Sequence, residues 1–296
     1  MKKNYFKYLL GAFVSILLLF ALVYWGEVSS ITNDGQSSKV KELEVDFLNV
    51  GQGDAIYIRT PDNVDVLIDG GPDNSILNEL GAVMPFWDKE IDLMILSHPH
   101  SDHVAGLVEV LRRYKVKKIL YTGVIHTAPD YLAWLKEIKD RKIPLEIVNK
   151  KSEIMIGSSV KLELLYPQKS FLNQRVVNLN NTSIVARLVY DQTSFLFTAD
   201  IEKEVEQELL RYDEEIFDSN VLKVAHHGSE SSSSLEFLLA VSPTLAVIQV
   251  GDENSFNHPH GKTLFNLKNL PSVIYRTDTQ GRIAMISDGQ KIIVEN

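Results

Sequence analysis

His98-Pro99-His100-Ser101-Asp102-His103 places three imidazoles and one carboxylate in one short stretch of the chain. The stretch directly follows an apolar run, from Ile91 to Leu96, that is typical of a buried strand. Alternate residues of extended backbone share a face, so His98 and His100 can point to one side while Asp102 and His103 follow. Imidazole nitrogen and carboxylate oxygen together suit zinc, manganese or iron. The stretch therefore predicts a metal centre with two pairs of ligands for two ions.

This histidine and aspartate pattern after a strand resembles the metal motif of the metallo-β-lactamase superfamily. Further motifs resemble the hydrolase domain of the ComEC family of DNA-uptake proteins, and they occur in the same order: Leu48-Asn49-Val50-Gly51-Gln52-Gly53-Asp54-Ala55, Leu67-Ile68-Asp69-Gly70-Gly71, Leu96-Ser97-His98-Pro99-His100, Val224-Ala225-His226-His227-Gly228-Ser229 and His258-Pro259-His260. The similarity runs from about Leu43 to Ile286. It implies an α/β fold, the four-layer αββα sandwich, with the metals at one edge. The segments Tyr275–Asp278 and Arg282–Ile286 are expected to close the second sheet.

Composition limits the classes of function. The 296-residue chain has 45% hydrophobic residues, no cysteine and a formal net charge of −9. The lack of cysteine excludes disulfides, thiolate metal sites and a catalytic cysteine. The acidic charge argues against a long track for duplex DNA, because such binding needs lysine and arginine to neutralise phosphates. We expect one soluble hydrolase domain at residues 42–296, preceded by an N-terminal appendage.

The appendage carries an uncharged apolar stretch at residues 8–25, preceded by Lys2, Lys3 and Lys7. As an N-terminal hydrophobic helix it would nearly span the hydrocarbon core of a bilayer, with the basic flank in the cytoplasm. Residues 1–25 are therefore predicted to be a single-pass membrane anchor that leaves the catalytic domain extracytoplasmic. A cleaved signal peptide, which would give a secreted protein, is the alternative. Residues 26–41 are rich in Ser, Asn, Asp and Gly and predict a flexible linker.

Two acidic residues end predicted strands. The resemblance assigns Asp200 as the acid that bridges two ions, although its position equally suits a cap of the following helix. It assigns Asp69 a supporting role beneath the metal loop, where it would orient ligands; a simple Asp-Gly turn is the alternative. Most superfamily members bring a third histidine to the first ion, but this chain has Asn178–Ser183 there. We therefore expect Asn181 or water in its place and one weakly held ion.

Four more histidines lie in the later motifs. By family position, His226-His227 supplies the last ligand of the second ion. Adjacent side chains of extended backbone point opposite ways, so we expect only one of the two to bind, and we favour His227 because it is nearer the turn. His226 is then a core histidine or a proton donor. His258 and His260 follow a buried strand in a loop, where they could bind phosphate, donate a proton to a leaving oxygen, or replace His227 as ligand. Ser229 and Arg276 are further candidates for binding substrate.

The resemblance implies a metal-dependent hydrolase, and in particular a phosphodiesterase or nuclease that degrades single-stranded DNA outside the membrane. Two zinc or manganese ions would activate water, Asp102 or Asp200 would orient it, and a loop histidine would protonate the departing oxygen. ComEC proteins join this domain to a multi-helix channel, whereas one candidate membrane segment predicts a separate DNA-uptake channel or an independent enzyme. Two alternatives stay open. One is hydrolysis of a small phosphodiester, ester or lactone, which the acidic charge favours, and the other is a tethered binding module without activity.

Overall fold

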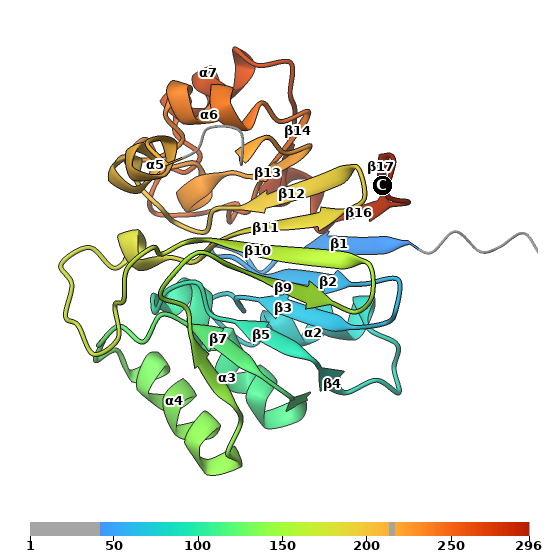
Figure 1. Ribbon diagram of the computed structural model, residues 1–296, viewed down its shortest axis with the longest axis vertical. Coiled ribbons are helices and arrows are strands. Elements are labelled where there is room, and N and C mark those ends of the chain that lie inside the picture. The colour runs from blue at the N-terminus through green and yellow to red at the C-terminus, as the bar shows by residue number, and fades with distance from the viewer. Residues whose placement is uncertain (1–41, 213–216, 296) are drawn as a thin grey trace, which may run out of the picture. The chain divides into compact units, whose positions relative to one another are not determined.

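Two β-sheets pack face to face in the computed structural model, which describes residues 42–212 and 217–295 (Figure 1). The first sheet has the strand order β17-β16-β1-β2-β3-β5-β7-β8 and the second has the order β15-β14-β13-β12-β11-β10-β9. The first sheet contains β1 (Leu43–Phe47), β2 (Ile56–Arg59), β3 (Asp65–Ile68), β5 (Leu93–Ile95), β7 (Ile119–Tyr121), β8 (Leu145–Ile147), β16 (Ile283–Ser287) and β17 (Ile292–Glu295). The second contains β9 (Ser152–Ile156), β10 (Val160–Tyr166), β11 (Val185–Tyr190), β12 (Thr193–Phe197), β13 (Val221–Lys223), β14 (Leu245–Ile248) and β15 (Val273–Arg276). Two short strands, β4 (Glu90–Ile91) and β6 (Lys115–Val116), pair separately.

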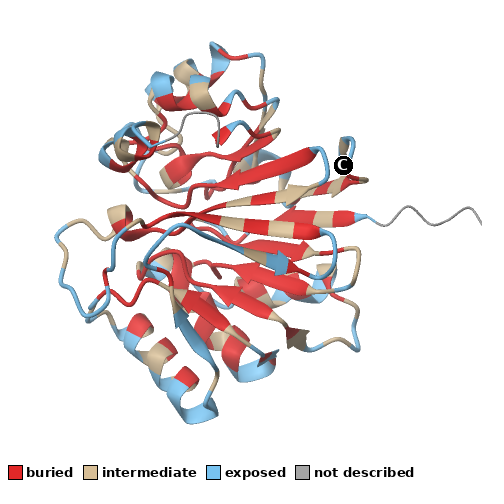
Figure 2. Cartoon of the chain, viewed as in Figure 1, coloured by how far each residue is buried: buried red, intermediate tan, exposed pale blue. Residues whose placement is uncertain are grey.

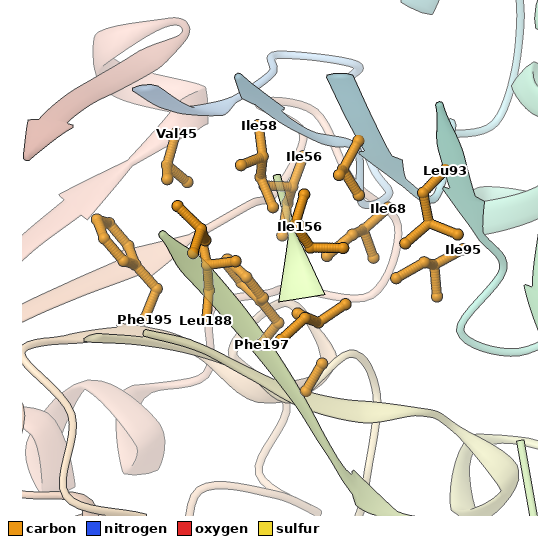
Figure 3. Close-up of a cluster of buried hydrophobic side chains, with 14 of the residues drawn as sticks. Val45, Ile56, Ile58, Ile68, Leu93, Ile95, Ile156, Leu188, Phe195 and Phe197 are labelled. Carbon is orange, nitrogen blue, oxygen red and sulfur yellow. The ribbon is translucent and has the colours of Figure 1, made fainter. Parts of the chain in front are cut away.

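Apolar side chains on the two inner faces hold the sheets together. Figure 3 shows Ile56 and Ile95 of the first sheet lying opposite Phe195 and Phe197 of the second, within one buried cluster. The outer face of the first sheet is buried as well, since Met94 is fully covered although its neighbours in β5 point inwards. Strands covered on both faces need apolar residues at successive positions, which explains the uninterrupted apolar runs in the sequence.

Helices cover both outer faces. Three pack on the first sheet: α2 (Ser75–Val83), α3 (Ser101–Arg113) and α4 (Pro129–Arg141). Three pack on the second: α5 (Lys203–Leu210), α6 (Leu235–Val241) and α7 (Gly261–Lys268). A short helix, α8 (Thr277–Gln280), follows β15. Figure 2 shows the helices buried on the side that faces the sheets and exposed on the other side. The described residues thus form the αββα layers that the sequence predicted.

The ends of the sheets differ in one respect from the prediction. The strands β1, β2 and β3 form an antiparallel meander. However, β16 pairs with β1, with Met285 opposite Val45, so the segment Arg282–Ile286 belongs to the first sheet, and β15 borders the second. The prediction was wrong here because a local apolar pattern identifies a strand without specifying its partner, which depends on long-range register.

The anchor or signal peptide expected at residues 1–25 and the linker expected at 26–41 lie outside the described residues. Among the helices that the structure describes, none has the length and apolar character needed to cross a bilayer. From Glu42 to Asn296 the chain forms one compact unit.

The carboxyl ends of the central strands carry the polar residues singled out above. β3, β5 and β7 are parallel in the first sheet, and β12 to β15 are parallel in the second. Asp69 follows β3, His98 follows β5, Asp200 follows β12 and His227 follows β13. Four of these loops therefore converge on one edge of the sandwich.

Candidate metal centre

The stretch from His98 to His103 forms the junction between β5 and α3. The helix begins at Ser101, so Asp102 and His103 lie in its first turn. A carboxylate at this position interacts favourably with the positive end of the helix dipole, which favours a helix start here. Extended backbone therefore carries the first two histidines, and the first helical turn carries the aspartate and the third.

One group of side chains joins the two sheets. Asp102, His103, Asp200 and His227 each offer a ligand atom, and these atoms all lie within 4.8 Å of one another. Asp200 Oδ2 is 3.3 Å from His103 Nε2 and 3.4 Å from His227 Nε2. His227 Nε2 is also 3.3 Å from Asp102 Oδ2. Two imidazoles and two carboxylates thus face a common centre.

His98 and His100 form a second group near Asp200. His98 Nε2 is 3.0 Å from His100 Nδ1 and 3.9 Å from Asp200 Oδ2. Asp200 is therefore near both groups, which is the position that a bridging carboxylate requires. Glu202, and not Asp200, precedes the first residue of α5 as its N-cap, so the structure does not support the capping interpretation.

The imidazoles are oriented by their second nitrogens. His98 Nδ1 donates to Ser97 Oγ (3.0 Å), His103 Nδ1 donates to Asp69 Oδ2 (2.8 Å) and His227 Nδ1 donates to the carbonyl oxygen of Gln249 (2.9 Å). These bonds place the protons on Nδ1 and leave each Nε2 lone pair free to face the two groups, which are together called the cluster. Metal-binding histidines are typically held in this way.

The residues present fit divalent metal ions. Within residues 42–212 and 217–295, the buried atoms His103 Nε2, His227 Nε2 and Asp200 Oδ1 have no hydrogen-bond partner. A buried polar atom without a partner is costly, typically by about 1–3 kcal/mol, unless a further group satisfies it. His103 Nε2 and His227 Nε2 both lie within 3.4 Å of Asp200 Oδ2, and imidazole with carboxylate is a donor set that suits zinc or manganese.

The electrostatics agree with this fit. Burial disfavours a charged His103, yet the carboxylates of Asp200, Asp102 and Asp69 raise its pKa well above the usual value. Burial is likewise outweighed at His227, where Asp200 and Asp54 raise the pKa well above normal. Such directions indicate a strongly negative potential at the cluster, which attracts cations.

A comparison with known families decides the identity of this fold. Residues 48–252 match the metallo-β-lactamase superfamily. The chain belongs to the metallo-β-lactamase superfamily. It is 30% identical to ComE operon protein 3 of Bacillus subtilis over 82% of this chain and 33% of that protein. It is 28% identical to competence protein ComA of Neisseria gonorrhoeae over 82% of this chain and 32% of that protein. The chain thus spans about a third of the length of these relatives.

The fold of the superfamily is also found in the solved structures. The metallo-β-lactamase fold protein YhfI of Bacillus subtilis superposes with a TM-score of 0.50 at 12% identity, covering 79% of this chain and 95% of that one. This likeness concerns the fold. The resemblance to ComEC-type competence proteins that the motifs indicated is confirmed by the sequence relatives.

Asp69 holds the segment between β5 and α3 in place through hydrogen bonds to Ser97 and His103. Its carboxylate accepts hydrogen bonds from Ser97 N (2.8 Å), Ser97 Oγ (2.6 Å) and His103 Nδ1. The next residue, Gly70, lies against α3, where a methyl group added to Gly106 would come within 1.9 Å of the Gly70 carbonyl oxygen. Glycine at position 106 therefore allows the helix that carries His103 to approach Asp69 closely.

Sequence reasoning missed two buried charged residues beneath the cluster. Lys223 is 0% exposed and forms an ion pair with Asp54, which is 2% exposed. Lys223 Nζ also donates to the carbonyl oxygen of Ala199 (3.3 Å) and lies 4.0 Å from Asp200 Oδ1. Burial opposes ionisation of Asp54, but Lys223 and His227 lower its pKa below the usual value. A signal was present in the sequence, because Lys223 interrupts the apolar run from Val221 to Ala225.

The adjacent histidines separate for a different reason from the one expected. His226 and His227 have left-handed backbone, with φ of 51° and 52°, inside the 3₁₀ segment Ala225–Gly228. The argument from extended backbone therefore does not apply. His227 joins the cluster, whereas His226 donates from Nδ1 to Ser231 Oγ (3.2 Å) and accepts at Nε2 from Asn180 Nδ2 (3.3 Å).

Asn180, and not the expected Asn181, is the asparagine that contacts His226. Asn181 lies in a 3₁₀ turn with Asn180, and its side chain turns to α5, where Asn181 Oδ1 accepts from Glu202 N (3.0 Å). Asn180 is buried and faces His226 instead. In a 3₁₀ turn successive side chains point in different directions, so a shift of one residue changes which of them meets the site.

A cleft of about 310 Å³ lies over the cluster, and six of its lining residues were predicted site residues: His100, Asp102, Asp200, His226, His227 and His258. Three other candidates do not line it. Ser229 is buried, with its hydroxyl 3.1 Å from that of Ser231. Arg276 Nε donates to Asp278 Oδ1 (3.0 Å), and His260 Nδ1 accepts from Glu230 N (3.1 Å). Local partners hold these three side chains, and none of them lines the cleft.

Proposed function

We propose that this chain is a metal-dependent phosphodiesterase that cleaves single-stranded DNA outside the cytoplasmic membrane, in competence-type DNA uptake or degradation. One observation carries the proposal: Asp200 lines a cleft, belongs to the group of Asp102, His103 and His227, and lies 3.9 Å from His98 Nε2 through its Oδ2. The relationship to competence proteins supports nucleic acid as the substrate.

In this proposal His98 and His100 hold one ion, Asp102, His103 and His227 hold the other, and Asp200 contributes to both. When bound, two zinc or manganese ions would polarise a phosphoryl group and lower the pKa of water. The first group has two imidazoles and a shared carboxylate, with no histidine in the segment Asn178–Ser183, so we expect its ion to be held more weakly.

The residues of the chain have distinct roles in handling protons. Asp102 faces the cleft with its side chain 30% exposed, and His103 and His227 overcome burial to lower the pKa of Asp102. It is therefore ionised at neutral pH and can orient the attacking water by accepting a hydrogen bond from it.

His258 faces the same space from the opposite loop. Gln52 Nε2 lies 3.5 Å from His258 Nδ1 and donates to it, so the neutral ring carries its proton on Nε2. Burial and the neighbouring His227 lower the pKa of His258 to about 4, which keeps the ring neutral at pH 7. Its Nε2–H is then available to bond a phosphoryl or departing oxygen.

A small phosphodiester, ester or lactone is the second candidate substrate, and the formal net charge of −9 favours it over a polyanion. We would test a lactone, a chromogenic phosphodiester and labelled single and double strands side by side, with manganese, zinc or chelator. Cleavage of single strands that needs metal and is lost in Asp102→Ala supports the nuclease. Turnover of the lactone alone would contradict it.

Metal analysis of the purified protein addresses the third possibility, an inactive binding module. We expect close to two ions per chain after incubation with manganese or zinc. Substoichiometric metal that added ions do not increase, together with no turnover of any substrate, would favour binding without catalysis.

The cellular setting is a separate part of the proposal. We propose an anchor at residues 8–25 that holds the domain outside the membrane, beside a separate DNA-uptake channel. Protease added to intact spheroplasts should then degrade the domain, and washing with high salt should not release it. Protection of the domain until the membrane is lysed would contradict the extracytoplasmic location.

A further inference from the structure

We propose that Phe256 is a stacking platform for a nucleobase of the single-stranded substrate, next to the phosphate in the metal cleft. This inference rests on the proposed function and adds how the strand is recognised. Phe256 lines the cleft together with the metal-binding side chains, and its side chain is 59% exposed. Phe256 thus presents an exposed aromatic ring at the cleft itself, where a bound strand would lie.

The ring of Phe256 has a defined orientation. It stacks on the imidazole of His258 with ring centres 5.6 Å apart and planes 24° from parallel. One face of the phenyl ring is therefore occupied, and the exposed surface leaves the rest of the ring available to a further planar group. A flat group stacked there would be adjacent to His258 and thus to the cleft floor.

The loop that carries Phe256 is fixed from within. The side chain of Asn254 accepts hydrogen bonds from Phe256 N (3.2 Å) and His258 N (2.9 Å), and it donates to the carbonyl oxygens of Gly251 (2.9 Å) and His258 (2.7 Å). Four bonds to one side chain hold the backbone on both sides of Phe256. The aromatic ring is thus pre-organised, which reduces the entropy lost when a ligand stacks on it.

Stacking explains how an acidic protein could bind a polyanion. The net charge of the chain is −9, and neither lysine nor arginine is among the described residues that line the cleft. Bases contribute to binding without charge, since every base has a flat face that stacks on an aromatic side chain, and loss of one such contact weakens binding by about 5- to 150-fold. Stacking also requires unpaired bases, so the same residue would select single strands over duplexes.

The test compares strands with and without bases. Full-length protein in mild detergent and manganese is titrated into labelled phosphorothioate oligothymidylate, whose backbone resists hydrolysis, and into a matched strand of abasic residues. Phe256→Ala should weaken binding of the oligothymidylate about tenfold and leave the abasic strand unchanged. Phe256→Trp should retain binding. Phe265→Ala is the matched control, because Phe265 on α7 is similarly exposed (67%) and does not line the cleft.

The outcomes distinguish the stacking role of Phe256 from the proposed cleavage of DNA. Equal weakening of both strands by Phe256→Ala, no weakening at all, or no preference of the unsubstituted protein for bases would overturn the stacking role. Base-dependent binding through Phe256 without cleavage of ordinary DNA would retain it and defeat the proposed reaction. Metal-dependent cleavage that is insensitive to Phe256→Ala would retain the reaction and defeat the stacking role.

Discussion

The buried pair of Lys223 and Asp54 makes a quantitative prediction about stability. Both side chains are almost fully buried, and each supplies the opposite charge that the other needs. Removal of one partner leaves an uncompensated charge in the interior, which typically costs about 3–5 kcal/mol. We therefore expect Lys223→Met and Asp54→Asn each to lower the free energy of unfolding by about that amount, or Tm by about 6–20 °C.

The double variant should be less affected than the sum of its parts. Asp54→Asn combined with Lys223→Met leaves no unpaired charge, so a coupling of about 2–3 kcal/mol is expected in a double-mutant cycle. Urea unfolding in the presence of chelator measures these values without a contribution from bound metal. Lys117→Met is the control, because Lys117 forms exposed ion pairs with Glu90 and Asp92 and should show no measurable change. Additive single effects, or single losses below about 1 kcal/mol, would refute the reasoning.

Three further predictions concern ligands, pH and packing. His100→Ala and Asp200→Ala should each abolish turnover while circular dichroism shows a folded protein; unfolding of both variants would contradict their assignment as metal ligands. Burial raises the pKa of Asp46 to about 6, so the unfolded chain ionises first as pH rises from 4 to 6 and the free energy of unfolding falls. Asp46→Asn should therefore gain about 1–3 kcal/mol at pH 8 and nothing near pH 4 in urea titrations, and an equal gain at both pH values would count against this linkage. Gly106→Ala should cost about 1–3 kcal/mol in thermal unfolding because its methyl group meets backbone, whereas Gly81→Ala on α2 has nothing within 4 Å and should be neutral or stabilising.

Most of the candidate site was predictable because its information is local. The stretch from His98 to His103 contains its ligands within one strand-to-helix junction, and Asp200 ends a recognisable strand. Lys223 and Asp54 were missed because their significance is a pairing between distant segments, which no local pattern contains. The offset from Asn181 to Asn180, and the left-handed backbone at His226, arise from 3₁₀ geometry that apolar periodicity does not specify.

The same distinction applies to the layers of the fold. The apolar run from Ile91 to Leu96 identified β5, and the family resemblance supplied the arrangement of the strands in two sheets. The final strands were divided between the sheets by pairing across the whole domain, since β16 adds to β1 near the start of the described chain. Edge pairing of this kind is decided by the assembled sandwich, so the sequence of Arg282–Ile286 alone could not reveal it.

The division of the metal ligands between the two sheets has a consequence for the order of folding. His98 to His103 follow a strand of the first sheet, whereas Asp200 and His227 follow strands of the second, far along the chain. Contacts between such distant segments form late in folding. Bringing the segments together costs loop-closure entropy before any stabilising contact has formed. An ion that needs both sets of ligands cannot nucleate the fold. It should instead slow unfolding and leave the folding rate nearly unchanged, because the metal stabilises only the folded state and not the transition state.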